Sequence, residues 1–173
     1  MAAINPLAKV PTLALEDGTV LFGSQTVTEY LDSISVNGVR VYPAPGVERW
    51  DALTRLSRAD LFFDIVTRII HERLLDHPGE HIVAWHWPKL MRALDEMERD
   101  ASRVAAFDIG QIGTLQALTF SSVRLKSDCH HRRRPISIGV KATQISQVGL
   151  NGPSNVVQLP ITSKNRLTVL IAP

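Results

Sequence analysis

Two short features near the start of the sequence have residue types that could bind a peptide-like ligand. Ser24 stands ahead of a run with helical spacing, and the N–H groups and dipole at a helix N-terminus favour an anion. Val10-Pro11 opens an apolar run, and an X-Pro bond adopts the cis form far more readily than other peptide bonds. Each feature also has a plain structural interpretation, since Ser24 could cap the helix and Pro11 could only shape a loop. The residues alone leave both interpretations open.

Three histidines in the middle of the chain have the residue type that binds metal ions. His71, His77 and His81 lie close together in the sequence. Their acidic neighbours are Glu72, Asp76 and Glu80. Pro78 and Gly79 break the helical register between His77 and His81, and the sequence has no His-Glu-x-x-His motif. We therefore predict polar helix faces and a helix-helix loop here, and no metal site.

The basic run HHRRRP, residues 130–135, could bind phosphate groups without sequence preference. No aromatic residue follows Phe120, so the base stacking that usually accompanies such contacts is not supplied. We predict a solvated segment and no nucleic-acid role, and keep a basic-tail nucleic-acid binder as an alternative. Cys129 is the single cysteine, which excludes an internal disulfide framework.

Short-range patterns predict two strands, a turn and a helix near the N-terminus. Residues 12–15 and 19–22 are apolar runs of strand length, and the Asp17-Gly18 pair between them favours a hairpin turn. Gly23-Ser24 offers a helix N-cap, and Asn37-Gly38 ends the helix that follows. Apolar residues recur in this helix at Val27, Tyr30, Leu31 and Ile34.

Three further helices are predicted after a linker. The first begins near Glu48, the second spans residues 80–102, and the third follows Asp108 and Gln111, which fit a capping box. The apolar stripe predicted for the first is Leu53, Leu56, Ala59, Phe63, Val66, Ile70 and Leu74. After Phe120 neither a helical nor a strand period persists.

The charges divide the chain of 173 residues into an acidic body and a basic tail. Residues 1–120 carry 11 Lys and Arg against 16 Asp and Glu, whereas residues 121–173 carry 8 against one. The tail is therefore an interaction segment or a segment of different origin. No apolar run reaches the roughly 18 residues of a membrane helix, and no secretory signal is recognisable. We expect a cytoplasmic protein.

Residues 5–32, NPLAKVPTLALEDGTVLFGSQTVTEYLD, resemble the cytosolic glutathione S-transferase family. The resemblance rests on the order Asn-Pro-Leu-x-Lys-Val-Pro-x-Leu, then Asp-Gly-x-x-Leu, then a Ser ahead of a helix ending in Glu-Tyr-Leu. It extends over roughly residues 4–120, because FDIGQIGTLQAL is similar to that family's all-helical C-terminal domain. The tail shows no such resemblance.

The resemblance implies a glutathione-binding site. In the family the bond that matches Val10-Pro11 is cis, and it turns the N–H and C=O of the preceding residue toward the cysteine backbone of glutathione. The family uses the Ser that matches Ser24 to hold the γ-glutamyl carboxylate. Lys9 and Gln25 complete the implied substrate-binding set. Glutathione is then a co-substrate, and no metal is required.

Two departures from the family pattern bear on activity. The family usually has Glu or Asp where Gly23 stands, and losing a charge-assisted bond worth about 1.5–3 kcal/mol would weaken glutathione binding roughly ten- to a hundredfold. The family's catalytic Tyr, Ser or Cys, near the end of its first strand, lowers the thiol pKa of glutathione. Ser24, Tyr30 and Cys129 do not match that position. We therefore assign no catalytic residue.

The predicted fold class is α+β and mainly α. We expect a partial thioredoxin-like β-β-α piece over residues 1–35, a linker over 36–46, a partial helical domain over 47–120, and a basic, disordered tail over 121–173. In the family's sheet the third strand lies between the first and the fourth. The strand at residues 12–15 matches the third, so we expect one of its edges to be bare and prone to association.

The implied function is conjugation of the glutathione thiolate to a small electrophile, impaired here, by a homodimer with no membrane partner. Arg58 and Asp60 could face the family's electrophile cleft, or they could be solvated. The alternatives are a non-catalytic glutathione-binding or protein-interaction module, and a non-functional fragment.

Overall fold

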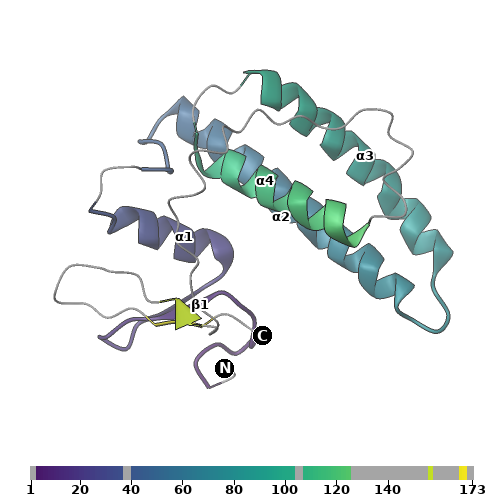
Figure 1. Cartoon of the computed structure of the whole chain (residues 1–173). Coiled ribbons are helices and arrows are strands. Elements are labelled where there is room, and N and C mark those ends of the chain that lie inside the picture. Colours follow the sequence, from purple (N-terminus) through teal and green to yellow (C-terminus); the bar gives the residue numbers. More distant parts are fainter. Residues whose placement is uncertain (1–2, 37–39, 104–106, 126–155, 158–167, 171–173) are drawn as a thin grey trace. The chain divides into compact units, whose positions relative to one another are not determined.

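The structure is a computed structural model (Figure 1). It describes residues 3–36, 40–103 and 107–125, and the backbone of residues 156–157 and 168–170. Cys129, the basic run at 130–135 and the predicted helix stop at 37–38 lie outside these residues. The chain divides into two compact units, one formed by residues 1–40 with 141–173 and the other by residues 41–140.

The first unit begins with the predicted hairpin. β1 (Thr12–Ala14) pairs antiparallel with β2 (Val20–Phe22), with Leu13 opposite Leu21. Gly18 has a φ of 86°, a left-handed conformation that glycine adopts without steric cost, and this lets the chain reverse. The hairpin prediction from the Asp-Gly pair is confirmed.

Helix α1 (Ser24–Ser33) packs against this hairpin. Val27 is buried with Leu13, which is fully inaccessible to solvent. The partly buried residues around them are Leu15, Leu21, Tyr30, Leu31 and Ile34. The N-cap of α1 is Gly23 and no side chain caps the helix, so the interpretation of Ser24 as its cap is wrong.

Two short strands of the tail complete a four-stranded sheet. β4 (Thr168–Leu170) pairs antiparallel with β1, and β3 (Val156–Val157) pairs antiparallel with β4, which gives the order β2-β1-β4-β3. The expected bare edge of β1 is therefore wrong, because β4 covers it. The residues that cover it are rich in β-branched types, which favour strands.

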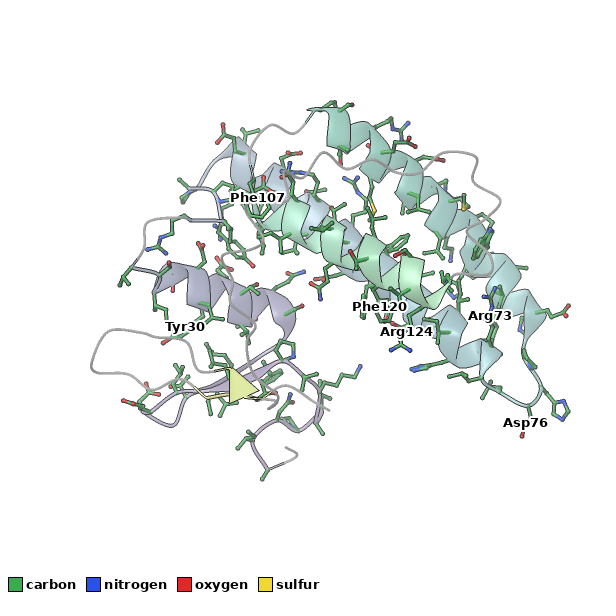
Figure 2. The ribbon with its side chains drawn as sticks, viewed as in Figure 1. Tyr30, Arg73, Asp76, Phe107, Phe120 and Arg124 are labelled. Atoms are coloured by element: carbon green, nitrogen blue, oxygen red, sulfur yellow. The ribbon has the colours of Figure 1, made fainter. Side chains whose placement is uncertain are left out.

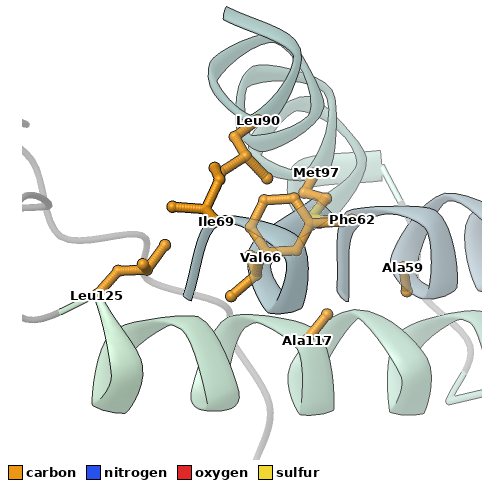
Figure 3. Close-up of a cluster of buried hydrophobic side chains, with 8 residues drawn as sticks. All are labelled: Ala59, Phe62, Val66, Ile69, Leu90, Met97, Ala117 and Leu125. Carbon is orange, nitrogen blue, oxygen red and sulfur yellow. The ribbon is translucent and has the colours of Figure 1, made fainter. Parts of the chain in front are cut away.

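The second unit contains α2 (Val47–Arg73), α3 (Glu80–Arg103) and α4 (Ile109–Arg124). α2 contacts both α3 and α4. Side chains from all three helices form the hydrophobic core of this unit (Figure 3). The buried members of this core are Ala59, Phe62, Val66, Ile69, Leu90, Met97, Ala117 and Leu125. Phe63 of α2 adds an aromatic contact to Phe120 of α4, with ring centroids 4.3 Å apart.

Contact on two sides changes which residues of α2 are buried. Phe62 and Ile69 are buried, whereas the predicted stripe contained Phe63 and Ile70, which are only partly covered. Leu74, at the end of that stripe, is 76% exposed because α2 ends at Arg73. Leu74 is therefore wrongly placed in the predicted stripe, whereas Phe63 and Ile70 still pack at the margin of the core.

α4 lies very close to α2 because it presents glycines to it. A Cβ atom added at Gly110 would lie 2.6 Å from the carbonyl oxygen of Ala52, and one added at Gly113 would lie 2.7 Å from Leu56 Cδ1. Asp108 caps this helix by accepting a hydrogen bond from the Gln111 N–H, which confirms the predicted cap. No described helix is both long and apolar enough to cross a membrane.

Candidate functional site

The Val10-Pro11 peptide and the start of α1 are held next to each other by the hairpin. The Val10-Pro11 bond is cis, as expected. The Gly23 N–H donates to the Pro11 carbonyl oxygen at 3.2 Å, one residue before α1 begins. Val10 and Ser24 therefore flank a hydrogen-bonded pair of residues, although 13 positions separate those two residues in the sequence.

A buried asparagine fixes the loop that carries Val10. Asn5 is 1% exposed, and its Nδ2 atom donates to the Lys9 carbonyl at 2.8 Å and to Thr12 Oγ1 at 2.9 Å. Its Oδ1 atom accepts the Leu7 N–H at 3.0 Å, which forms a side-chain turn. Thr12 Oγ1 in turn donates to the Lys9 carbonyl at 2.9 Å. The loop therefore has a defined path into β1.

Residue types and short-range spacing assign no role to Asn5 or Thr12. Asn5 belongs to the quoted Asn-Pro-Leu pattern, and an asparagine ahead of a proline is a recognised turn signal. The reach of its amide to Lys9 and Thr12 depends on the loop path, which short-range patterns do not supply. Both residues act by positioning the loop, and neither presents a reactive group to solvent.

Val10, in the loop just before β1, is an exposed residue. Its side chain and main chain together are 42% exposed, and within the described part of the chain its N–H and C=O have no hydrogen-bond partner. Unpaired, exposed main-chain groups next to a strand are what an extended peptide needs to add to a sheet. The geometry therefore suits a short extended ligand.

Ser24 begins α1 in an exposed position. The first intrahelical hydrogen bond of α1 runs from the Val27 N–H to the Gly23 carbonyl at 3.0 Å, so the amides before Val27 form the positive end of the helix. No acidic residue occurs in the first turn. A carboxylate beside Ser24 would therefore meet an amide-rich helix end without a competing negative charge.

Three other residues of this unit have simpler settings. Lys9 and Gln25 are both exposed, on the loop and on the first turn of α1 respectively. Tyr30 is partly buried against the Leu13 and Val27 cluster (Figure 2). Lys9 precedes Pro11 by two residues and Gln25 follows Gly23 by two, whereas Tyr30 has a packing role.

Arg58 of the second unit forms an ion pair. Its Nη1 atom lies 2.6 Å from Asp100 Oδ2, and the two side chains are 22% and 12% exposed. Asp100 also pairs with Arg103 at 2.5 Å. Burial alone would raise the pKa of Asp100, but the hydrogen bonds from Arg103 and Arg58 outweigh it and hold that pKa below its usual range. Asp60 is partly buried on the same helix.

The histidines do not assemble a metal site in the described part of the chain. There, no group of three or more His, Cys, Asp or Glu side chains gathers closely enough to hold a metal ion. Glu72, one of the acidic neighbours, instead accepts the Gly79 N–H at 2.7 Å and closes the loop between α2 and α3. Burial lowers the pKa of His86, a residue of α3.

One protein-family model matches the N-terminal part of the first unit. The model described as "Glutathione S-transferase, N-terminal domain" matches residues 1–34, which contain the hairpin, Val10-Pro11 and α1. Among curated proteins, none matches the sequence.

Solved structures similar to the chain extend the match beyond the first unit. Two are of a glutathione transferase family member from Pseudomonas fluorescens Pf-5. The one with bound S-(propanoic acid)-glutathione is 32% identical, with 72% of this chain and 65% of that chain covered and a TM-score of 0.66. The one with bound glutathione is 30% identical, with coverages of 84% and 73% and a TM-score of 0.71.

A third structure supports the fold. A glutathione S-transferase from Methylobacillus flagellatus KT, with glutathione bound, is 23% identical, has a TM-score of 0.67, and is matched over 72% of this chain. The chain spans 65% of the length of the first and third of these structures. The shared architecture is a thioredoxin-like piece followed by a helical transferase domain.

Proposed function

This chain belongs to the glutathione transferase family, and we propose that it binds glutathione between the Val10 backbone and the N-terminus of α1. The observation that carries the proposal is the hydrogen bond from the Gly23 N–H to the Pro11 carbonyl, which sets an exposed strand entrance beside an exposed helix start. A tripeptide with a carboxylate on its γ-glutamyl residue has the chemistry to use both.

Each part of the ligand has a counterpart in this site. The N–H and C=O of Val10 pair with the cysteine backbone of glutathione as an added strand would. Ser24 Oγ and the amides of the first turn hold the γ-glutamyl carboxylate. Lys9 and Gln25, exposed on either side, complete the site.

The chemistry that follows binding is conjugation of the glutathione thiolate to a small electrophile. We propose that this step is weak in this chain, because Gly23 stands where the family usually has an acidic residue that helps to hold glutathione. The proposed partners are glutathione, the electrophile and a second copy of the chain, in the cytoplasm. A glutathione-binding module without turnover is the second candidate. The exposed, uncharged Val10 site supports glutathione binding in this module as much as in a transferase.

Retention of the purified chain on immobilised glutathione, followed by elution with free glutathione, tests the binding proposal. A turnover assay with a generic aromatic electrophile separates the two candidates. Retention with turnover above the uncatalysed rate supports the transferase, and retention without it supports the binding module. Passage through the matrix without delay contradicts both.

A further inference from the structure

Strand β1 has a second hydrogen-bonding edge, opposite the one that pairs with β2. On the β2 side, the Gly23 N–H donates to the Pro11 carbonyl, and the Leu15 N–H donates to the Thr19 carbonyl at 2.9 Å. In an antiparallel ladder the residues that face one neighbour alternate with those that face the other. Leu13 therefore faces β2, and Thr12 and Ala14 direct their N–H and C=O groups to the opposite edge.

The opposite edge is occupied by a segment from the far end of the chain. β4 pairs there with Leu170 opposite Thr12 and Thr168 opposite Ala14. The other edge of β4 is paired with β3, so the tail contributes a two-stranded ribbon to the sheet. The two residues of β1 whose backbones face outward are thus the two that meet Leu170 and Thr168.

The sequence of this segment suits strand addition. Residues 167–171 read LTVLI, without a charged residue, glycine or proline. β-branched and large apolar residues fit the pleated surface of a sheet, and an open edge beside such a sequence is a template for pairing with another chain. A second copy of this chain offers the same β1 edge and the same segment.

We infer that the edge of β1 is a strand-addition site, and that the chain's own Thr168–Leu170 is its resident partner. The tail then occupies, within one molecule, the edge at which a second copy would otherwise add. A role for the basic, weakly patterned tail follows from this: it completes the sheet and blocks intermolecular edge pairing.

Amide hydrogen exchange on the unmodified full chain tests the pairing directly. Leu13 serves as the internal reference, since its amide is bonded to β2 whether or not the tail is in place. We expect the protection factors of Thr12 and Ala14 to lie within about tenfold of that of Leu13. Protection of Leu13 with more than tenfold weaker protection of Thr12 and Ala14 would show an open edge and overturn the inference, as would absence of protection at all three amides.

Cysteine pairing shows which molecule supplies the strand. In a Cys129→Ser background, Ala14→Cys with Thr168→Cys places thiols at directly opposite positions, within the Cα separation that a disulfide tolerates. Ala14→Cys with Val169→Cys is the matched control, because successive strand residues lie on opposite faces. We expect the 14/168 pair to oxidise at least about tenfold faster than the control, at a rate independent of protein concentration, to a product of monomer size. Equal rates for the two pairs, or a product formed only between two chains, would contradict the inference.

Discussion

The amide of Asn5 donates to Thr12 Oγ1 at 2.9 Å, and both residues are almost completely buried. This bond joins the loop that leads to Val10 to the first residue of β1. Because Thr12 Oγ1 and Asn5 Nδ2 also both donate to the Lys9 carbonyl, three residues form a closed hydrogen-bonded ring under the proposed ligand site. The position of the Val10 backbone therefore depends on a side chain five residues earlier.

Replacing Asn5 by Ala should loosen this loop. The buried Thr12 hydroxyl and Leu7 N–H lose partners, which we expect to reduce the free energy of unfolding by about 1–3 kcal/mol and to weaken glutathione binding. Chemical denaturation and calorimetric titration measure the two effects. Thr12→Val is the comparison variant, because it removes the two bonds of the ring that use Thr12 Oγ1, keeps the bond from Asn5 to the Lys9 carbonyl, and preserves the side-chain shape. A stable Asn5→Ala variant with unchanged glutathione affinity would show that the ring does not position the site.

A side chain at Gly23 would have room, but its backbone conformation would be strained. It has a φ of 89°, and an added Cβ would meet no atom within 4 Å. Gly23→Ala should therefore cost about 1–2 kcal/mol through backbone strain alone. Gly23→Asp should carry a similar cost but bind glutathione roughly tenfold more tightly than Gly23→Ala, through a charge-assisted bond to the ligand ammonium group. Equal glutathione affinities for the Ala and Asp variants would argue against a ligand ammonium group at this position.

Asp108 links the start of α4 to α2 by two different interactions. Its carboxylate accepts the Gln111 N–H at 3.1 Å and lies 2.7 Å from Arg55 Nη2, with both charged side chains less than 10% exposed. Asp108→Ala removes this partner and leaves Asp51, whose Oδ2 atom lies 3.2 Å from Arg55 Nη2, as the remaining carboxylate, so we expect a loss of about 1.5–3 kcal/mol in the free energy of unfolding.

Asp108→Asn separates the cap from the ion pair. Asparagine caps a helix about as well as aspartate, so only the charge interaction is lost and the denaturation midpoint should fall less than for alanine. Identical midpoints for the two variants would mean that the cap contributes nothing here.

Asp100 should make the helical unit sensitive to acid. Its pKa in the folded chain lies below the unfolded value, so the unfolded state binds a proton first as the pH falls. The stabilisation from its pairs with Arg58 and Arg103 is complete above the unfolded pKa, near 4, and is lost as the pH falls through the lower folded value. Denaturation of the wild type and Asp100→Asn from pH 7 to pH 3 measures this. The difference between them should shrink on acidification, and a constant difference would contradict the assignment.

Local signals in the sequence predicted the elements that depend on short-range chemistry. The Asp17-Gly18 turn and the Asp108 cap are present as expected, because each is decided within four residues. The faces of α2 were less predictable. Helical spacing fixes which residues share a stripe, but contact with both α3 and α4 decides that Phe62 and Ile69 are buried.

The site and the sheet edge show the same division between local and long-range information. Val10, Pro11 and Ser24 stood out by residue type, but Asn5 was missed because its partners are chosen by the loop path. The pairing of β4 with β1 joins residues more than 150 positions apart, and no periodicity within either segment encodes that register.

Calorimetric titration of the full chain with glutathione, beside Ser24→Ala and Thr26→Ala, measures whether the chain binds glutathione and whether Ser24 holds it. Both residues are exposed on the first turn of α1, so Thr26→Ala controls for a change in helix propensity. We expect saturable binding that weakens roughly tenfold in Ser24→Ala and stays unchanged in Thr26→Ala. The absence of saturable heat at millimolar glutathione, or equal affinities for the wild type and Ser24→Ala, would contradict it.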